Sequence, residues 1–314
     1  MFRYTCLILF FTLVAVLNTA FAQYYQLTPN VGGINWTEQV VRATGYGSPN
    51  PNMPPGSRRA GAIEAAKATA RKNMMQVVKG INLDSKSTIE NLISKDETLE
   101  TQINGVVRSF RIIDTRYIQA GAIEVDVEVS LSSLYEILPK DEEKSKLPQI
   151  QHQQDQLSTQ PHQQPALNSN SLGQPNSLLP STEPGSFNNL NIPNNQNILQ
   201  ASVYTGLIID ARGLDARPAL SPVILNESGY EIYSADFVQP QLVSRSGVVV
   251  YEKGIERAHQ STKVSDSPLV VTAIGTTGAN KADIIISNDD ANRIQQSNAN
   301  SNFLTKGNVL IVLD

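Results

Sequence analysis

The chain has 314 residues, of which 40% are hydrophobic and 17% are charged, and its formal net charge is −4. This length predicts about two domains. The mild negative charge disfavours nucleic acid and anionic lipid as main partners, because both need clustered lysine and arginine. The only cysteine is Cys6, and the histidines are His152, His162 and His259. We therefore expect no disulfide, no metal site and no cofactor.

The N-terminus predicts export. Arg3 supplies a positive start, residues 6–17 are almost entirely apolar, and Ala20 and Ala22 form the small-x-small pattern of a signal cleavage site. We expect residues 1–22 to be a signal peptide that is cut after Ala22. The alternative is an uncleaved membrane anchor, because the apolar run is nearly long enough to span a bilayer.

Residues 31–138 predict a small α+β domain in which helices pack on an antiparallel sheet. Its clearest element is a helix over residues 57–80, which follows a proline-rich loop. Serine at its start and glycine at its end favour an N-cap at Ser57 and a left-handed stop at Gly80. Apolar residues at spacings of three and four predict one buried stripe, made of Ile63, Ala66, Ala70, Met74 and Val77.

The pattern around this helix predicts strands over 34–44 and 81–88, a helix over 89–109 that breaks near Ser94, and a hairpin of 110–118 and 122–131. The last strand alternates apolar residues with Glu124, Asp126 and Glu128, which places three carboxylates on its water-facing side. We expect Arg111 or Arg116 on the neighbouring strand to pair with them. The alternative is an acid–base or cation site.

A resemblance to a known family is carried by two segments, AIEAAKATARKNMMQVVKGINLDSKSTIENL and INGVVRSFRIIDTRYIQAGAIEVDVEVSLSSLYEIL. They resemble the bacterial Lpp-twenty domain, the family of a twenty-kilodalton outer-membrane lipoprotein. Similar domains occur in flagellar assembly proteins T and P, which build outer-membrane rings. The resemblance covers about Trp36 to Leu138 and implies the α+β fold without any catalytic residue. Cys6 lies too early to carry a lipid, so we expect peripheral membrane association without a lipid anchor.

Residues 139–200 are rich in glutamine, asparagine, proline and serine. Such a composition offers too few apolar groups for a packed core. We expect a disordered tether between two domains. The alternative is a contact surface for a cell-wall polymer or a partner.

Residues 201–314 predict a second, mixed α/β domain. Apolar runs and turn signals predict strands over 203–210, 222–225, 230–233, 248–251, 268–274, 282–286 and 308–313. Ser287 is expected to cap a helix near residues 289–296. The final strand–helix–strand spacing predicts a parallel crossover whose strands are covered on both faces. The runs YTGLIIDARGL and ADIIISNDDANRI are similar to a C-terminal region that accompanies the Lpp-twenty domain in some exported bacterial proteins, and no activity comes with it.

The loop DARGLDARP at residues 210–218 is the candidate site of this domain. Its charged residues are Asp210, Arg212, Asp215 and Arg217. The two carboxylates suit a cation, and the two guanidinium groups suit an anion such as a peptide carboxylate. The alternatives are an ion-paired structural loop, a ligand or partner site, and a catalytic site.

Taken together, these patterns predict an exported, non-enzymatic envelope protein of a Gram-negative bacterium, located in the periplasm or at the outer membrane. The expected role is structural or in assembly, with a flagellar ring component as its concrete form. Envelope proteins and further copies of the chain are the expected partners, and nucleic acid is not. The alternative is a periplasmic binding module that holds a small ligand, peptide or glycan through the 210–218 loop.

Overall fold

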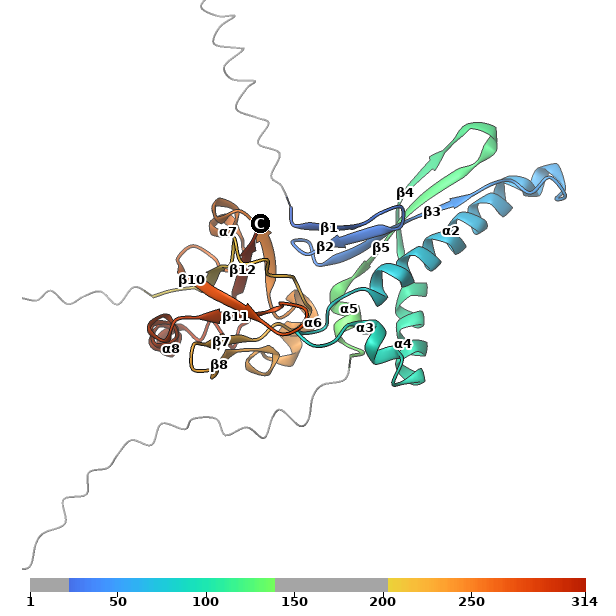
Figure 1. The fold of residues 1–314 in the computed structure, drawn as a ribbon. Coiled ribbons are helices and arrows are strands. Elements are labelled where there is room, and N and C mark those ends of the chain that lie inside the picture. The colour runs from blue at the N-terminus through green and yellow to red at the C-terminus, as the bar shows by residue number, and fades with distance from the viewer. Residues whose placement is uncertain (1–22, 139–202) are drawn as a thin grey trace, which may run out of the picture. The chain divides into compact units, whose positions relative to one another are not determined.

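The computed structural model describes residues 23–138 and 203–314, which belong to one compact unit (Figure 1). The predicted signal peptide, residues 1–22, and the predicted tether, residues 139–200, lie outside the described residues. The described chain comprises an N-terminal domain of helices on an antiparallel sheet and a C-terminal domain of helices around a mixed sheet. This confirms the predicted fold class.

The N-terminal domain is built on a five-stranded antiparallel sheet with the order β1-β2-β3-β5-β4. Its strands are β1 (Tyr25–Thr28), β2 (Gly32–Asn35), β3 (Val40–Gly47), β4 (Arg111–Tyr117) and β5 (Ile123–Ser130). Its helices are α2 (Pro55–Lys79), α3 (Ile89–Ile93), α4 (Glu97–Arg108), the short η1 (Gln119–Gly121) and α5 (Leu131–Tyr135). The predicted hairpin and the break between the two shorter helices are both confirmed.

Two predicted strands of this domain are wrong. The run 34–44 divides into β2 and β3, because the Asn35 side chain accepts a hydrogen bond from the Glu38 N–H at 2.9 Å and Gln39 adopts a positive φ of 57°. Both features make a turn, which a pattern of apolar residues does not reveal. The run 81–88 forms a loop with one bridge between Asn82 and Thr88. Both of these segments contact the C-terminal domain.

The long helix α2 lies along β3 and β5 at very short range (Figure 1). A Cβ atom added at Gly45 would lie 2.1 Å from the Ala66 carbonyl oxygen, and one at Gly47 would lie 2.1 Å from that of Ala62. Glycine on the strand and alanine on the helix therefore let the two backbones meet. The predicted stripe is confirmed except at Ile63, which is only partly buried, and Ala62 is buried beside it.

The predicted start of α2 at Ser57 is wrong, and its predicted end at Gly80 is right in position but not in backbone conformation. Pro54 is the N-cap and Pro55 opens the helix, so Ser57 lies within the first turn and no side chain caps the start. Proline suits this position because its fixed φ matches the helix and its missing N–H would have no partner there. Gly80 ends the helix with a right-handed φ of −78°.

The face of the sheet opposite α2 carries an ion-pair network, which confirms the pairing expected across the hairpin. Its pairs are Arg116 with Asp114, Glu124 and Asp126, and Glu128 with Arg111 and Arg42. Hydrogen bonding from Arg116 lowers the pKa of Asp126 despite partial burial. Each carboxylate of the network is thus paired with an arginine, and Asp126 stays ionised near neutral pH.

The C-terminal domain is built on a seven-stranded mixed sheet with the order β8-β7-β11-β10-β6-β12-β9. Its strands are β6 (Gly206–Asp210), β7 (Ile224–Asn226), β8 (Glu231–Tyr233), β9 (Val250–Lys253), β10 (Pro268–Thr277), β11 (Asp283–Ile286) and β12 (Val309–Leu313). Its helices are η3 (Ala235–Phe237), α6 (Pro240–Ser246), α7 (Ile255–Gln260) and α8 (Asn288–Ser301). Ser287 caps α8 by accepting a hydrogen bond from the Asp290 N–H at 3.0 Å, as predicted.

The predicted parallel crossover between β11 and β12 is wrong. Strands β10, β6, β12 and β9 are parallel to one another, whereas β11 is antiparallel to β10. Therefore β11 and β12 run in opposite directions, and β10 and β6 lie between them. A continuous apolar run indicates that a strand is buried, but it carries no information about strand direction.

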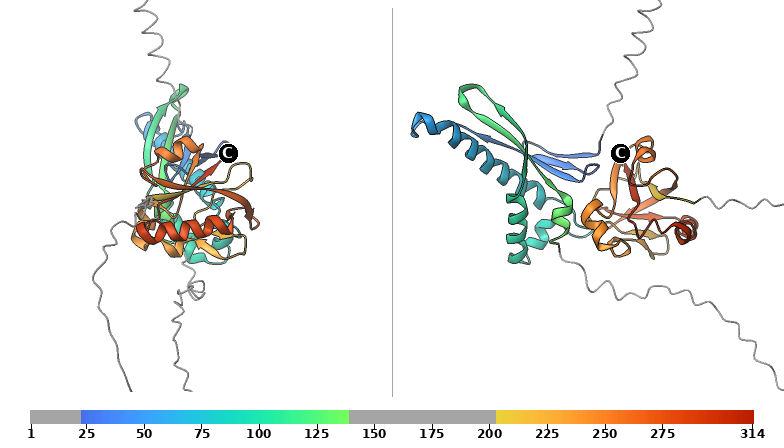
Figure 2. Two further views of the ribbon diagram at one scale, coloured as in Figure 1. Left: turned by 90° about the vertical axis from the view of Figure 1, so that its left-hand side faces the viewer. Right: turned by 180° about the vertical axis from the view of Figure 1, so that it is seen from behind.

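Helices cover both faces of the parallel part of this sheet, as the turned views show (Figure 2). Ile208 and Leu310 join Ala258 of α7 in one apolar cluster, whereas Ile311 joins Ile294 of α8 in the main core. All five residues of β12 are buried. The predicted coverage of this strand on both faces is thus confirmed.

Loops of the N-terminal domain make direct contacts with the C-terminal domain. The Leu220 N–H donates to the Asn82 carbonyl oxygen at 3.0 Å, and the Ser85 hydroxyl donates to the buried Asp283 carboxylate. The Trp36 and Tyr251 rings meet edge to face with centroids 5.5 Å apart. These contacts bring the start of β1 to the C-terminal domain.

In residues 23–138 and 203–314, no helix combines the length and apolar character needed to cross a membrane.

Candidate functional site

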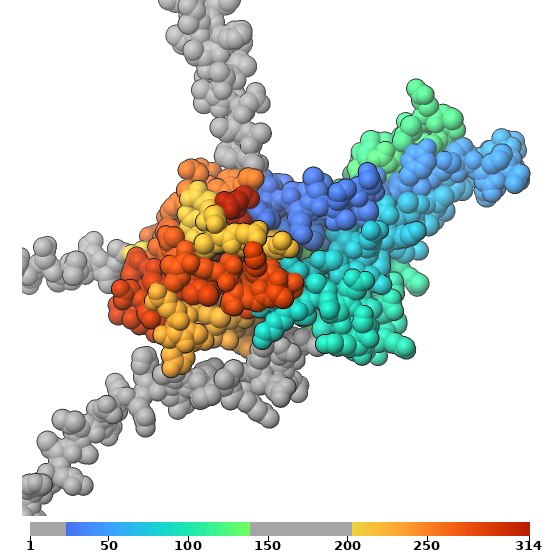
Figure 3. Space-filling view, in the orientation of Figure 1, coloured from blue at the N-terminus to red at the C-terminus, as the bar shows by residue number. Residues whose placement is uncertain are grey.

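The parallel strands of the C-terminal domain place two chain segments side by side at their carboxyl ends. The 210–218 loop follows β6, and Asp314 follows the adjacent parallel strand β12. Ligands of open α/β sheets bind at such carboxyl ends. At the surface, the last residues of the chain adjoin the first described residues (Figure 3).

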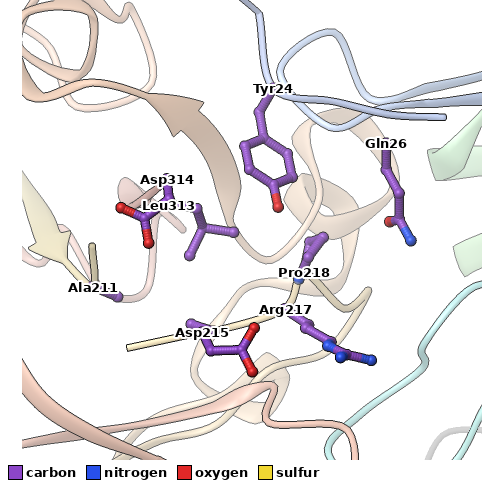
Figure 4. A pocket seen from close by; sticks show the side chains of 9 residues that line it. Tyr24, Gln26, Ala211, Asp215, Arg217, Pro218, Leu313 and Asp314 are labelled. Carbon is purple, nitrogen blue, oxygen red and sulfur yellow. The ribbon is translucent and has the colours of Figure 1, made fainter. Parts of the chain in front are cut away.

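A cavity of about 330 Å³ lies at the carboxyl ends of β6 and β12 (Figure 4). It is lined by Tyr24, Gln26, Ala211, Asp215, Ala216, Arg217, Pro218, Leu313 and Asp314. Figure 4 shows the Tyr24 hydroxyl directed into the cavity, with Asp314 and Arg217 on opposite sides of it. The N-terminal domain therefore contributes Tyr24 and Gln26, and the C-terminal domain contributes the remaining lining.

Two of the four predicted site residues line the cavity, and the other two lie outside its lining. Asp210 and Arg212 pair with each other outside the cavity lining, through two contacts of 2.6 and 2.8 Å. Asp215 lines the cavity and pairs with Lys281 at 2.6 Å. Arg217 also lines the cavity, and its guanidinium forms no hydrogen bond or ion pair with another residue of the described chain. The cavity therefore contains half of the predicted set.

Two groups of the cavity, Asp215 and Tyr24, keep their protonation states near neutral pH. Hydrogen bonding from Lys281 lowers the pKa of Asp215, so this carboxylate stays ionised. Burial raises the pKa of the Tyr24 phenol, and Asp314 raises it further while Arg217 opposes the shift. Tyr24 therefore keeps its proton. Fixed charges and a protonated hydroxyl suit recognition better than proton transfer at pH 7.

Three polar lining residues were not predicted from the sequence, namely Tyr24, Gln26 and Asp314. Gln26 accepts a hydrogen bond from the Trp36 indole at 3.0 Å through Oε1, which leaves its amide nitrogen available. Asp314 accepts the Gly213 N–H at 2.8 Å through Oδ2, which leaves Oδ1 available. The one sequence signal was that Asp210 ends one predicted buried strand and Asp314 directly follows another. No local pattern marks Tyr24 or Gln26, because their position depends on packing between the domains.

The two loop carboxylates proposed as cation ligands do not converge. Asp210 accepts from Arg212, and Asp215 accepts from Lys281. Within residues 23–138 and 203–314, no group of three or more histidine, cysteine, aspartate or glutamate side chains is placed to hold a metal ion.

Comparison with known families matches the domain that carries most of this cavity. Residues 206–314 are similar to the second domain of Tp0624 from Treponema pallidum. The match begins at β6 and extends through β12, so it includes Asp215, Arg217 and Asp314 and excludes Tyr24 and Gln26. Comparison with curated proteins finds no match to the chain.

Proposed function

We propose that this chain is an exported, non-enzymatic envelope protein that acts by binding, and that the cavity beside the 210–218 loop holds a small ligand. The observation that carries the proposal is the Arg217 guanidinium, which lines the cavity and has no hydrogen-bond or ion-pair partner in the described chain. Arginine presents a planar fork of donors that matches a carboxylate. Arg217 is exposed and its guanidinium can be hydrated, so a ligand with an anionic group would replace water at this fork.

The size and chemistry of the cavity support binding of a small molecule. Its volume of about 330 Å³ lies at the lower end of the range of roughly 300 to 1,000 Å³ for ligand sites. The ionised Asp215 and the protonated Tyr24 provide fixed recognition groups. The signal-peptide pattern at residues 1–22 supports a periplasmic or outer-membrane location.

Native mass spectrometry of the full chain, purified from envelopes without denaturation, tests the ligand. We expect a bound small molecule in the wild type and in Arg212→Ala, and none in Arg217→Ala. Arg212 is the matched control, because it belongs to the same loop but pairs with Asp210 outside the cavity lining. A protein that carries no ligand, or one that retains it equally in both variants, would contradict the proposal.

Export is tested by the mass of the mature N-terminus. A signal peptide cut after Ala22 leaves Gln23 as the first residue. We expect the envelope fraction to contain this shortened chain. A full-length chain in the cytosol would contradict export, and a full-length chain in the membrane would favour the uncleaved anchor.

A second candidate function, assembly through self-association, is favoured by the free edge of the N-terminal sheet. Strand β4 is an edge strand, and its apolar residues Ile112, Ile113 and Tyr117 are exposed, Tyr117 by 61%. Exposed edges pair readily with strands of other chains. The occupant that fits is β4 of a second copy, because antiparallel pairing about Thr115 places Asp114 opposite Arg116 of that copy.

Sedimentation of the full chain over a range of concentrations tests this assembly. We expect a dimer in the wild type and a monomer when Tyr117→Lys places a new charge at the edge. Leu27→Lys on β1, the opposite edge of the same sheet, is the matched control and should leave the dimer intact. A wild-type monomer at every concentration, or equal effects of the two variants, would contradict assembly through β4.

A further inference from the structure

The charged side chains at the cavity are balanced but separated. Asp215 is neutralised by Lys281 at 2.6 Å. This leaves one positive side chain, Arg217, and one negative side chain, Asp314, neither of which forms an ion pair within the described chain. They lie on opposite sides of the cavity (Figure 4). A ligand that satisfies both must therefore carry both charges.

We propose that the ligand is a small zwitterion, between a free amino acid and a dipeptide in size, and this inference rests on the proposed binding function. Its carboxylate accepts hydrogen bonds from the Arg217 guanidinium, and its ammonium group donates to the free Oδ1 of Asp314. Charge-assisted hydrogen bonds of this kind are stronger than neutral ones. The opposite arrangement would bring like charges together at both ends, so the cavity also fixes the direction of the ligand.

The remaining lining suits the body of such a ligand. The Tyr24 hydroxyl and the Gln26 amide nitrogen are available to a peptide or carboxylate oxygen. Leu313, Ala211 and Pro218 offer apolar surface to a small side chain. A purely anionic ligand such as inorganic phosphate would meet the unpaired carboxylate of Asp314, and repulsion from it disfavours such a ligand.

The ligand would contact both domains, and the chain contains a reporter of that contact. Trp36 is the single tryptophan, and its indole N–H donates to Gln26 at 3.0 Å. A ligand that engages the Gln26 amide changes the surroundings of this indole. Trp36 fluorescence therefore reports occupancy of the cavity without a label.

The experiment titrates the full chain with a matched series of probes: alanine, dialanine, N-acetyl-dialanine and dialanine amide. Dialanine carries both charges, the acetylated form only the carboxylate, and the amide only the ammonium group. We expect saturable binding of dialanine or alanine, and binding weaker by about tenfold or more when either charge is removed. The two zwitterions differ in length, so their relative affinities define the ligand size.

Two conservative variants assign each charge to its residue. In Asp314→Asn, whose amide oxygen can still accept from Gly213, dialanine and N-acetyl-dialanine should bind equally. In Arg217→Gln, dialanine and dialanine amide should bind equally. Arg212→Gln should leave all affinities unchanged, because Arg212 pairs with Asp210 outside the cavity lining.

The outcomes separate this inference from the proposed function. Equal affinity of the wild type for dialanine and either singly charged probe would overturn the zwitterion. Failure of every probe, while the purified wild type retains a ligand that Arg217→Ala lacks, would overturn the ligand class and leave the binding function intact. Failure of every probe together with the absence of any retained ligand would overturn both.

Discussion

The two sheets of this molecule bury their apolar residues in different ways. The five-stranded sheet packs one face against α2, and its other face carries paired charges, so β5 alternates strictly between buried and half-buried residues. The parallel core of the seven-stranded sheet is covered on both faces, and β12 is buried along its whole length. The first sheet relies on close helix–strand contact, whereas the second relies on deep burial. Substitutions should affect the two sheets differently.

The largest expected effect is the loss of a buried side chain from the second sheet. Ile311 in β12 is fully buried, and Ile311→Ala should lower the free energy of unfolding by about 4 kcal/mol, through lost burial and a residual cavity. The matched change Ile113→Ala on the exposed edge of the first sheet should cost less than about 1 kcal/mol. Urea unfolding measures both. Similar losses in the free energy of unfolding for the two variants would contradict the difference in burial between Ile311 and Ile113.

A change of a single methyl group tests the close contact in the first sheet. Gly45→Ala should cost about 3 kcal/mol, because the new Cβ would lie 2.1 Å from the Ala66 carbonyl oxygen and would force α2 off β3. Gly105→Ala in α4 is the control, where no atom lies within 4 Å of the added Cβ. It should stabilise the protein by about 0.5 to 1 kcal/mol through better helix propensity. An unchanged free energy of unfolding in Gly45→Ala would contradict the close contact between α2 and β3.

A buried lysine should make the second domain more stable at alkaline pH. Burial lowers the pKa of Lys263 to about 8, from an ordinary value of 10.5. Between these values the unfolded chain binds more protons than the folded one, so the contribution of this group to stability rises with pH. Between pH 7 and 9 we expect a gain of about 1 kcal/mol relative to Lys263→Met. The same pH dependence of the free energy of unfolding in the wild type and in Lys263→Met would contradict the lowered pKa of Lys263.

The smallest expected effect is the loss of one ion pair from the charged face of the first sheet, and it depends on acidic pH. Hydrogen bonding from Arg116 lowers the pKa of Asp126 below its ordinary 3.8. Its contribution to stability is therefore present above pH 3.8 and is lost as the pH falls through the lowered value. Asp126→Asn should cost about 0.5 kcal/mol at pH 7, because the pair is partly exposed. That difference should shrink below pH 4, and a constant difference would contradict the pairing.

The contrast between the sheets also explains which parts of the fold were predictable. Alternation along β5 predicted the buried set and the water-facing carboxylates, and so it led to the correct pairing with Arg111 and Arg116. The continuous run in β12 predicted burial alone, and the predicted parallel crossover from β11 failed. The turn at Gln39 depends on one side-chain hydrogen bond and a positive φ, which leave no periodic trace.

The candidate site was predictable only in part. Asp215 and Arg217 were recognised as charged residues of a polar loop, and the structure places both in the cavity lining. Arg212 lies five residues before Arg217 and has the same side chain, but it is paired with Asp210. Spacing alone does not distinguish a paired arginine from an unpaired one. Tyr24 comes from the other domain, and only tertiary packing brings it to the loop.

The most direct test of the central claim observes the Arg217 guanidinium itself. In the nitrogen-15 NMR spectrum of the full chain, the Arg217 Nε–H signal should shift and saturate as dialanine is added. The Arg212 signal is an internal standard, because this side chain is already bound to Asp210. We expect a saturable shift for Arg217 and an unchanged signal for Arg212. An unchanged Arg217 signal, or equal shifts of both, would contradict the binding of a dipeptide zwitterion at Arg217.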